Sequence, residues 1–255
     1  MLLAVDVGNT NIVYGLFEGE ALVHQFRVES ARGRTADEYA VQLHALLGMH
    51  GVDARSVDAA IVACVVPSLN EPMAQLVKRG FGRDPLVVGP GIRTGMAILI
   101  ENPREVGADR IADAVAGFDR AKGGVVVVDF GTSTNFDCVT PKGEYLGGVL
   151  APGLQISADA LFTRAAKLSR VEIAMPPKVV GKNTVQAMQS GIVYGYVGLV
   201  DGLVTRIKEE LGFPCAVIAT GGLASLIAPL SKTIGEVDDH LTLTGLRILY
   251  DRNRV

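Results

Sequence analysis

An acidic residue ends the first apolar segment of the chain. Met-Leu-Leu-Ala-Val is followed directly by "DVGNTN", which runs from Asp6 to Asn11. A carboxylate at a strand end caps a turn, forms a turn or belongs to a site. The glycine, asparagine and threonine that follow offer backbone N–H groups and hydroxyls, which bind phosphate oxygens well. We therefore treat "DVGNTN" as a candidate phosphate loop, with a simple hairpin turn as the alternative.

The same pattern returns in the second half of the chain. "VVVVDFGTSTNFDCV" (125–139) is again an apolar strand, an aspartate, a glycine and small polar residues before a second strand. The matched pairs are Asp6 with Asp129, Gly8 with Gly131 and Thr10 with Ser133. Two such loops facing each other would hold the phosphates of a nucleotide from both sides. Their aspartates would supply hard oxygen ligands to Mg²⁺ or to another cation.

Between the two loops, "VGADRIAD" (106–113) places an acid and a base among apolar residues. We predict that Asp109 and Arg110 lie in the first turns of a helix that is capped at Asn102 and continues to about Lys122. Asp109 would accept the proton of a substrate hydroxyl, and Arg110 would pair with a substrate carboxylate or with phosphoryl charge. The alternative is an ordinary solvated helix face.

Other catalytic and nucleotide motifs are absent. Ser133 lacks the following glycine of a nucleophile elbow, so its hydroxyl is expected to bond a phosphate. "GKNT" (181–184) lacks the upstream glycine and the adjacent hydroxyl of a Walker loop. "TGG" (220–222) would let an adenine ring lie against bare backbone, or it forms a strand-to-helix turn. The three cysteines and four histidines show no metal-ligand spacing.

Composition excludes several classes of protein. Hydrophobic residues make up 49% and charged residues 20% of the 255 residues, as in a globular protein. The net charge of −3 gives no basic surplus for nucleic acid or for a membrane surface. No signal peptide or spanning apolar run is recognisable, and the isolated cysteines suggest reduced thiols. We therefore expect a cytoplasmic protein with no membrane and no nucleic acid among its partners.

The remaining pattern predicts alternating strands and helices. A capping box of Thr35 with Glu38 opens the first expected helix, and Ser68 with Glu71 opens the second. The expected strands cover residues 2–5, 12–17, 21–28, 57–66 and 86–88 in the first half, and the two segments flanking residues 131–135 in the second.

Two long segments near the C-terminus are predicted to be helical. Residues 183–211 carry four glycines, Gly191, Gly195, Gly198 and Gly202. Because glycine is costly inside a helix, this spacing favours close backbone packing, with a second subunit as one candidate for the packing partner. Residues 241–253 form an amphipathic pattern, with Leu243, Leu246, Leu249 and Tyr250 on one side and Arg247 and Arg252 on the other.

The repeated loop divides the chain into two similar halves. We expect an α/β fold with two domains, each a mixed sheet flanked by helices, and a seam near residues 116–123. The predicted domains are residues 1–117, with the first loop and the "GADR" helix, and residues 118–255, with the second loop, the adenosine motif "TGG" and the long helix.

These motifs, taken together, resemble those of the type III pantothenate kinase family, within the superfamily of acetate kinase, sugar kinases, heat-shock chaperones and actin. The resemblance rests on "DVGNTN", "NPREVGADRI", "DFGTSTNFD", "GGVLAPGL", "GKNTVQAMQSG" and "ATGGLA", and it covers nearly the whole chain. It implies duplicated ribonuclease H-like domains and ATP-dependent phosphorylation of pantothenate to 4'-phosphopantothenate, the first step of coenzyme A biosynthesis. It also implies a homodimer with a composite active site, Mg²⁺ and a monovalent cation such as K⁺ or NH₄⁺.

The resemblance assigns roles by position. Asp109 would be the general base, Asp129 would hold the monovalent cation, and Asp6 would hold Mg²⁺ and take part in catalysis. Thr184, from across the dimer, would complete the pantothenate pocket. The ATP-binding residues would be Asp6, Val7, Gly8, Asn9, Thr10, Asn11, Ile12, Val13, Gly131, Thr132 and Gly221. The substrate-binding residues would be Ile100, Gly107, Ala108, Asp109, Arg110 and Thr184.

This chain departs from the family pattern at two places. Ile100 stands where the family usually has an aromatic residue, so one wall of the substrate pocket is expected to differ. Ser133 and Asn135 replace alanine and threonine in the second loop, and Asn135 would change cation coordination. The alternatives are another phosphotransferase or phosphatase of the superfamily, or a non-catalytic regulator with the same fold. The retained acids argue against the regulator.

Overall fold

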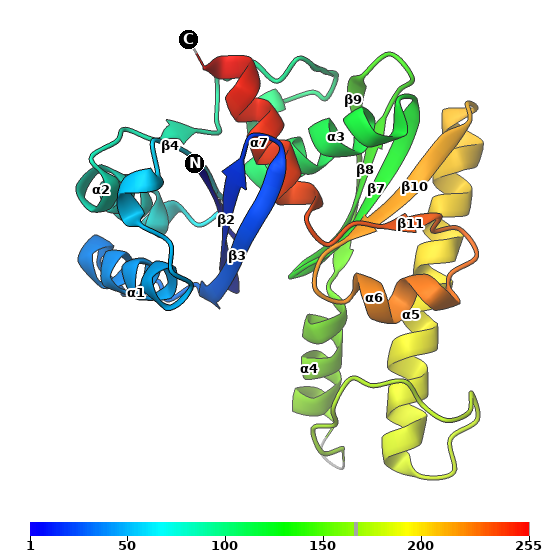
Figure 1. Ribbon diagram of the computed structural model, residues 1–255. Helices are drawn as coiled ribbons and strands as arrows, with labels where there is room; N and C mark the ends of the chain where they lie inside the picture. The colour runs from blue at the N-terminus through cyan, green and yellow to red at the C-terminus, as the bar shows by residue number, and fades with distance from the viewer. Residues whose placement is uncertain (166–167, 255) are drawn as a thin grey trace. The chain divides into compact units, whose positions relative to one another are not determined.

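Two mixed β-sheets, each in its own compact unit, form the framework of the chain (Figure 1). The computed structural model describes residues 1–165 and 168–254. The first unit contains Met1–Ala97, Glu101–Ala116 and Leu241–Val255, and the second contains Ile98–Ile100 and Gly117–His240. The expected α/β class is confirmed. The described helices include none that is long and apolar enough to cross a membrane.

The first sheet has the strand order β3-β2-β1-β4-β5. Its strands are β1 (Leu2–Val7), β2 (Asn11–Glu18), β3 (Ala21–Glu29), β4 (Ala59–Cys64) and β5 (Leu86–Val87). Strand β1 pairs antiparallel with β2 and parallel with β4. The carboxyl ends of β1 and β4 therefore meet at one edge of the sheet, where the first candidate phosphate loop begins.

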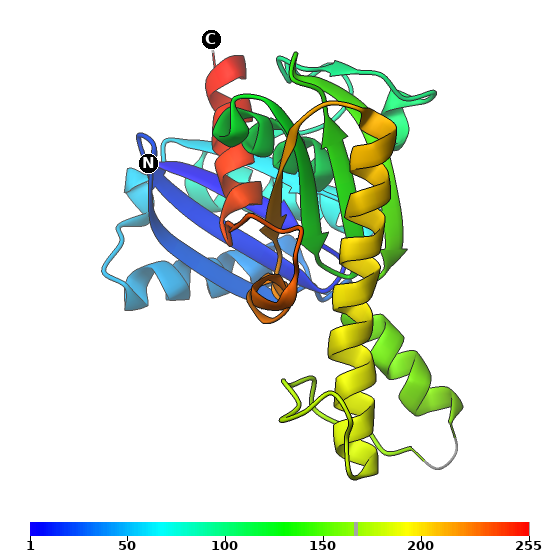
Figure 2. The same cartoon turned by 90° about the vertical axis from the view of Figure 1, so that its right-hand side faces the viewer.

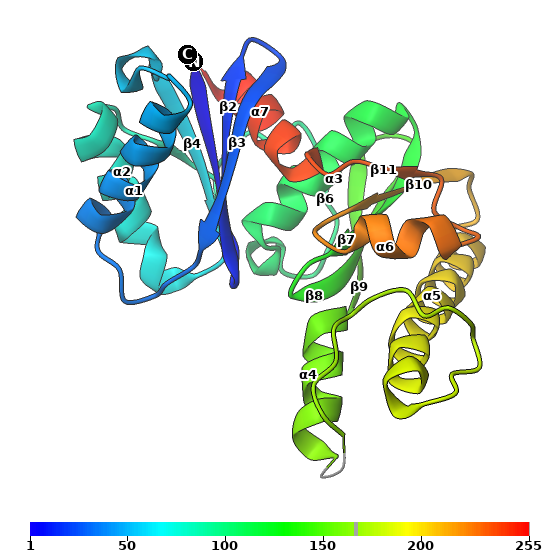
Figure 3. The ribbon, with the colours of Figure 1, turned by 60° about the horizontal axis from the view of Figure 1, so that its bottom comes forward.

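Helices cover both faces of this sheet (Figure 3). Helices α1 (Ala36–Met49) and α2 (Asn70–Phe81) lie on one face, and α7 (Leu241–Asn253) lies on the other, against β1 and β4. Leu3, Ala4 and Val5 are consequently all fully buried. An apolar run without alternation is what a strand buried on both faces requires.

Local hydrogen bonds set the ends of the helices in the first unit. The predicted capping box of α1 is confirmed, because Thr35 and Glu38 bond reciprocally. The predicted cap of α2 is wrong. Ser68 lies within a 3₁₀ turn (Pro67–Leu69), and α2 starts at Asn70 without a side-chain cap. An α-helix capped at Ser68 would need the N–H of residue 72 to bond the Ser68 carbonyl, and Pro72 has none.

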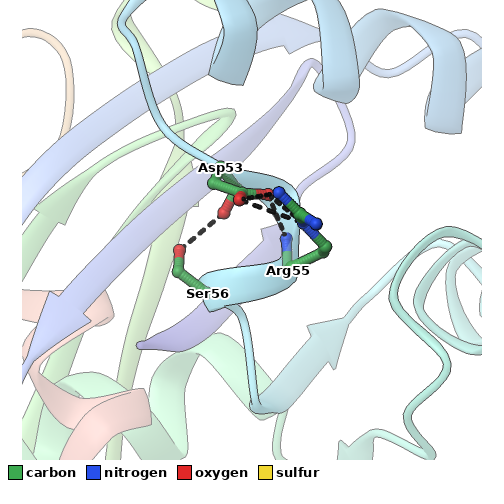
Figure 4. A network of polar contacts seen from close by, with 3 residues as sticks. All are labelled: Asp53, Arg55 and Ser56. Carbon is green, nitrogen blue, oxygen red and sulfur yellow. Dashed lines mark hydrogen bonds and ion pairs between the residues drawn. The ribbon is translucent and has the colours of Figure 1, made fainter.

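An acidic cap also shapes the connection from α1 to β4 (Figure 4). The Asp53 carboxylate accepts a hydrogen bond from the Arg55 backbone N–H at 2.9 Å and ion-pairs with the Arg55 guanidinium at 2.8 Å. The Ser56 hydroxyl donates to the Asp53 carbonyl oxygen at 2.6 Å. These contacts close the 3₁₀ turn Ala54–Ser56, after which the chain enters β4.

The helix that carries Asp109 begins later than predicted. Asn102 caps only a 3₁₀ turn (Pro103–Glu105), and Val106 is extended, with φ −73° and ψ 124°. Helix α3 (Ala108–Ala121) is a separate element whose first helical bond runs from the Ile111 N–H to the Gly107 carbonyl. Asp109 is therefore the second residue of α3, where the unpaired N–H groups of a helix start are found.

The second sheet has the order β11-β10-β7-β8-β9-β6. Its members are β6 (Ala97–Ile98), β7 (Gly124–Phe130), β8 (Ser133–Val139), β9 (Glu144–Pro152), β10 (Cys215–Thr220) and β11 (Glu236–Val237). The helices of this unit are α4 (Leu154–Arg164), α5 (Thr184–Leu211) and α6 (Ala224–Ile227). Figure 2 shows α5 running along the sheet and continuing past its edge beside α4.

Helix α5 is the helix predicted over residues 183–211, and Asn183 caps it through the Gln186 N–H at 2.9 Å. Its apolar face packs on β7, β8 and β10 in one core cluster that includes Val193, Val200 and Val204. Three of its glycines, Gly191, Gly195 and Gly198, have no atom within 4 Å of where a Cβ would lie, among the residues that the structure describes. The expected close packing of these glycines is therefore not made within the described chain.

The last helix, α7, differs from its predicted pattern in one residue. Leu243, Leu246 and Leu249 are buried as expected. Arg247, predicted on the solvent side, has a side chain that is only 12% exposed and is ion-paired with Asp251 at 3.0 Å. Helix α7 packs on β1 and β4 and therefore belongs to the first compact unit. The predicted first domain, residues 1–117, does not contain this helix.

Candidate active site

The first candidate phosphate loop joins β1 to β2. The Gly8 N–H donates to the Asn11 carbonyl at 3.0 Å, which closes a tight turn over residues 8–11. Two residues after β3, which sequence reasoning missed, hold this turn. The Ser30 hydroxyl donates to the Gly8 carbonyl at 2.6 Å, and the Arg32 guanidinium donates to the Asn9 side chain at 3.3 Å. No motif marks them, because their role depends on the pairing of β3 with β2.

Asp6 occupies the end of β1 beside this turn. Its Oδ1 atom is buried and has no hydrogen-bond partner among the described residues. The pKa of Asp6 is raised to about 7, chiefly by burial and also by the nearby Asp109 carboxylate, and the positive charge of Arg27 partly offsets this rise. A buried carboxylate with an unused oxygen is the arrangement expected at a cation or substrate site.

Asp109 lies in the first turn of α3 against Gly107. Its Oδ1 atom accepts a hydrogen bond from the Arg110 backbone N–H at 2.8 Å. A Cβ at position 107 would overlap this oxygen, so "GADR" needs its glycine for the carboxylate to pack as it does. Burial raises the pKa of Asp109 above its ordinary value, while the Arg110 N–H and guanidinium oppose the rise.

The first unit thus brings several predicted site residues together. Asp6 and Asp109 are close enough for the charge of one to raise the pKa of the other. Gly107 lies near Val65, the residue after β4's final cysteine, so the "GADR" segment adjoins the carboxyl end of β4. The solvated-face alternative for Asp109 is disfavoured, because burial is the largest influence on its carboxyl group.

The second candidate loop joins β7 to β8 through a turn that is one residue shorter than that of the first loop. The Gly131 N–H donates to the Ser133 carbonyl at 3.0 Å. The two departures from the family pattern form one pair here, since the Ser133 hydroxyl donates to the Asn135 side-chain oxygen at 2.9 Å. Residues two apart on a strand share a face, which allows this bond. Asp129 is the penultimate residue of β7 and lies opposite Asn135 in the register of β7 and β8.

The "TGG" segment lies against the end of β7. Thr220 pairs with Asp129 across β10 and β7. Gly221 has φ +90°, and a Cβ there would overlap the Asp129 carboxylate and the Phe130 backbone. Both the backbone angle and the space therefore require glycine at this position.

Two predicted substrate residues of the second unit lie in different places. Ile100 packs against Gly147 of β9, where a Cβ would lie 3.2 Å from the Ile100 side chain. Thr184 is the exposed first residue of α5 and borders a cavity of about 760 Å³. That cavity is lined mainly by apolar residues of α4 and α5, including Leu161, Met188 and Tyr196. No hydrogen bond recorded for the described residues joins Thr184 to the second loop.

The donor set fits Mg²⁺ bound chiefly through a nucleotide. Among the described residues, no group of three or more histidine, cysteine, aspartate or glutamate side chains could hold a metal ion. Mg²⁺ often uses only one or two carboxylates together with phosphates and water. The unused, buried Oδ1 of Asp6 supplies one such oxygen.

Comparison with known proteins adds independent information. The family model for type III pantothenate kinase matches residues 2–206. A type III pantothenate kinase of Anaeromyxobacter sp. (strain Fw109-5) is 58% identical over 254 residues, covering 100% of both chains. That of Myxococcus xanthus (strain DK1622) is 56% identical over 253 residues, covering 99% of both.

Solved structures support the fold alone. A proposed Baf family transcriptional activator of Campylobacter jejuni matches with a TM-score of 0.61 at 18% identity, covering 98% of both chains. A proposed 2-dehydro-3-deoxygalactonokinase of Sinorhizobium meliloti matches with a TM-score of 0.59 at 14% identity, covering 100% of this chain and 98% of that one. With its loops, its "GADR" helix and relatives that match end to end, this chain belongs to the type III pantothenate kinase family.

Proposed function

We propose that this protein transfers the γ-phosphoryl group of ATP to pantothenate, as its family name states, with Asp109 as the group that accepts the proton of the pantothenate hydroxyl. The product would be 4'-phosphopantothenate, which is used for coenzyme A. The observation that carries the assignment is the packing of the Asp109 carboxylate against Gly107, beside Asp6, at the start of α3.

The environment of Asp109 suits a general base. Burial raises the pKa of its carboxyl group, which makes the carboxylate a better proton acceptor than an ordinary aspartate. Its bond with the Arg110 N–H holds one oxygen in place, at 2.8 Å. An alcohol is nevertheless far too weak an acid to be deprotonated in advance. Asp109 therefore orients the hydroxyl for direct in-line attack and takes the proton late in the transfer.

The phosphate-binding groups come from the two loops. Residues Asp6 to Val13 supply backbone N–H groups and the Thr10 hydroxyl to the phosphates, and Gly131 and Thr132 supply those of the second loop. Asp6 would hold Mg²⁺, which neutralises phosphate charge when it is bound with ATP. Asp129 would hold a monovalent cation, and Gly221 would face the adenosine.

The pantothenate pocket would use Gly107, Ala108, Asp109 and Arg110. The Arg110 guanidinium is suited to a carboxylate, which pantothenate carries. Ile100 would supply an aliphatic wall where relatives have an aromatic ring. Thr184 would reach this pocket from a partner subunit in a homodimer, which accords with its exposure at the start of α5.

The first prediction concerns Asp109→Asn. We expect kcat to fall at least 100-fold, because asparagine cannot accept the proton, while ATP affinity changes little. ADP release coupled to a dehydrogenase, with and without pantothenate and with K⁺ or Na⁺, measures this. Asp119→Asn is the matched control, because Asp119 lies on the same helix but ion-pairs with Lys122 at the surface. If kcat of Asp109→Asn stays within fivefold of the unmodified enzyme, Asp109 is not the group that accepts the proton of the pantothenate hydroxyl.

A further inference from the structure

A tyrosine hydroxyl holds the segment that contacts the first phosphate loop. The Tyr39 hydroxyl of α1 accepts a hydrogen bond from the Ala31 N–H at 2.9 Å and donates to the Ala31 carbonyl at 3.0 Å. The preceding residue, Ser30, bonds the loop through its hydroxyl to Gly8 at 2.6 Å and through its N–H to the Thr10 carbonyl at 3.0 Å. One hydroxyl thus fixes the short segment that holds the loop.

In the second unit, another tyrosine hydroxyl holds the segment that contacts the second loop. The Tyr196 hydroxyl of α5 donates to the Pro152 carbonyl at 2.6 Å and bonds the Ser157 hydroxyl at 2.7 Å. The next residue, Gly153, donates its N–H to the Thr132 carbonyl of the loop at 3.1 Å. A Cβ at Gly153 would overlap that carbonyl, so the support approaches as bare backbone. This contact gives a role to "APG" in the "GGVLAPGL" motif.

The two supports share one construction, although they use different elements. Each has a buried tyrosine on a helix, with 0% exposure for Tyr39 and 7% for Tyr196. In each, the hydroxyl bonds the backbone of a residue next to the one that contacts the loop. A tyrosine has few rotatable bonds, so its hydroxyl holds a position with little entropy cost. Loop N–H groups bind phosphate best when their directions are fixed beforehand.

We propose that Tyr39 and Tyr196 are positioning residues for ATP, each acting through its hydroxyl on one of the two phosphate loops. Neither side chain is expected to touch the nucleotide. The inference rests on the proposed function, because it takes both loops to bind ATP phosphates. The inference goes beyond the proposed function, because it places residues that determine ATP affinity in α1 and α5, outside every nucleotide motif.

The test uses Tyr39→Phe and Tyr196→Phe, which remove only the hydroxyls. Calorimetry with ADP and Mg²⁺ measures the dissociation constant and the number of sites. We expect the ADP dissociation constant to rise about three- to tenfold in each variant, with the KM for pantothenate within twofold. Ser30→Ala and Ser157→Ala weaken the same supports and serve if a tyrosine variant does not fold.

Matched controls separate positioning from general stability. Tyr250→Phe in α7 and Tyr194→Phe in α5 remove hydroxyls for which no hydrogen bond is recorded among the described residues, and they should leave ADP affinity unchanged. Loss of stability alone lowers the number of competent sites and kcat, not the affinity of the sites that remain. An ADP dissociation constant equal to that of the controls, at full stoichiometry, would overturn the inference.

Loop variants distinguish this failure from failure of the proposed function. Thr10→Ala and Thr132→Ala alter the loops themselves. If they weaken ADP binding and the tyrosine variants do not, the loops bind phosphate but Tyr39 and Tyr196 do not position them. If neither loop variant changes ADP affinity, the assignment of the loops to ATP is wrong, and the positioning role is wrong with it.

Discussion

At the residue scale, the burial of the Asp6 carboxylate has a cost in stability. Its Oδ1 atom is buried without a hydrogen-bond partner in the described part of the chain, and its pKa is about 7 instead of the ordinary 3.8. Below pH 3.8 the group is protonated in both the folded and the unfolded states, so it has no effect on stability. As pH rises toward 7, the unfolded chain ionises first, and the free energy of unfolding falls. Above pH 7 the loss is complete.

We therefore predict that Asp6→Asn stabilises the nucleotide-free protein at high pH. Its free energy of unfolding, relative to the unmodified protein, should be higher at pH 8 than at pH 5 by roughly 2–3 kcal/mol. Urea denaturation at the two pH values, without ATP or Mg²⁺, measures this. Asp84→Asn is the control, because Asp84 is exposed in a surface pair with Lys78. Equal effects of Asp6→Asn at both pH values would contradict the assigned pKa.

At the element scale, α7 sets the position of α3 within the first unit. Gly245 of α7 lies so close to the Ala112 carbonyl that a Cβ would overlap it. Near this contact, the hydroxyl of Thr242, three residues before Gly245, donates to the carboxylate of Asp113, the buried residue after Ala112, at 2.7 Å. Asp113 is one helical turn from Asp109, so this contact between helices fixes the direction of the helix that carries the proposed base.

Gly245→Ala should accordingly weaken both folding and catalysis. We expect the free energy of unfolding to fall by about 1–3 kcal/mol and kcat to fall with it, because the added methyl group forces α7 from α3. Gly48→Ala in α1 is the matched control, since no atom lies within 4 Å of its Cβ position. It should stabilise the helix by up to about 1 kcal/mol. Urea denaturation and steady-state kinetics measure both, and similar results for the two variants would refute the close contact.

At the scale of the whole molecule, one face of α5 is not covered by other described residues. Among the described residues, nothing lies within 4 Å of the Cβ positions of its Gly191, Gly195 and Gly198. Its Val185 and the neighbouring Leu161 of α4 are exposed, and an apolar cavity of about 760 Å³ borders Thr184. A helix face of small residues beside exposed apolar side chains suits a second copy of the chain. This accords with the proposed homodimer, in which Thr184 of one subunit serves the pocket of the other.

Mixing two inactive variants tests the composite site. Asp109→Asn and Thr184→Arg each block every site of their own homodimers. If sites combine Asp109 and Thr184 from different subunits, a mixed dimer has one intact site and one with both changes. After subunit exchange of equal amounts, activity should return to about a quarter of the unmodified level. Sedimentation confirms the dimers, and a mixture that stays inactive despite measured exchange would argue that each site is built within one subunit.

Much of the fold follows from local pattern. The Thr35 capping box and the apolar runs of β1 and β7 act over a few neighbouring residues, so they could be predicted. The start of α3 could not, because an Asn-Pro helix signal extends only to the 3₁₀ turn before Val106. The half-buried position of Arg247 was also missed, because a charged residue is expected at the surface, and its ion pair with Asp251 forms only in the folded helix.

The sequence by itself determined the duplicated loops, the α/β class and the family, because these depend on residue types at fixed spacing. Only the tertiary structure decided that the charge of Asp109 raises the pKa of Asp6. It also decided that Ser30 and Arg32 bond the first loop. The tyrosines Tyr39 and Tyr196, which bond the segments that contact the two loops, likewise follow from the fold alone. Spacing along the chain constrains local geometry. Burial and electrostatic coupling depend on which strands and helices pack together, and no short motif records that.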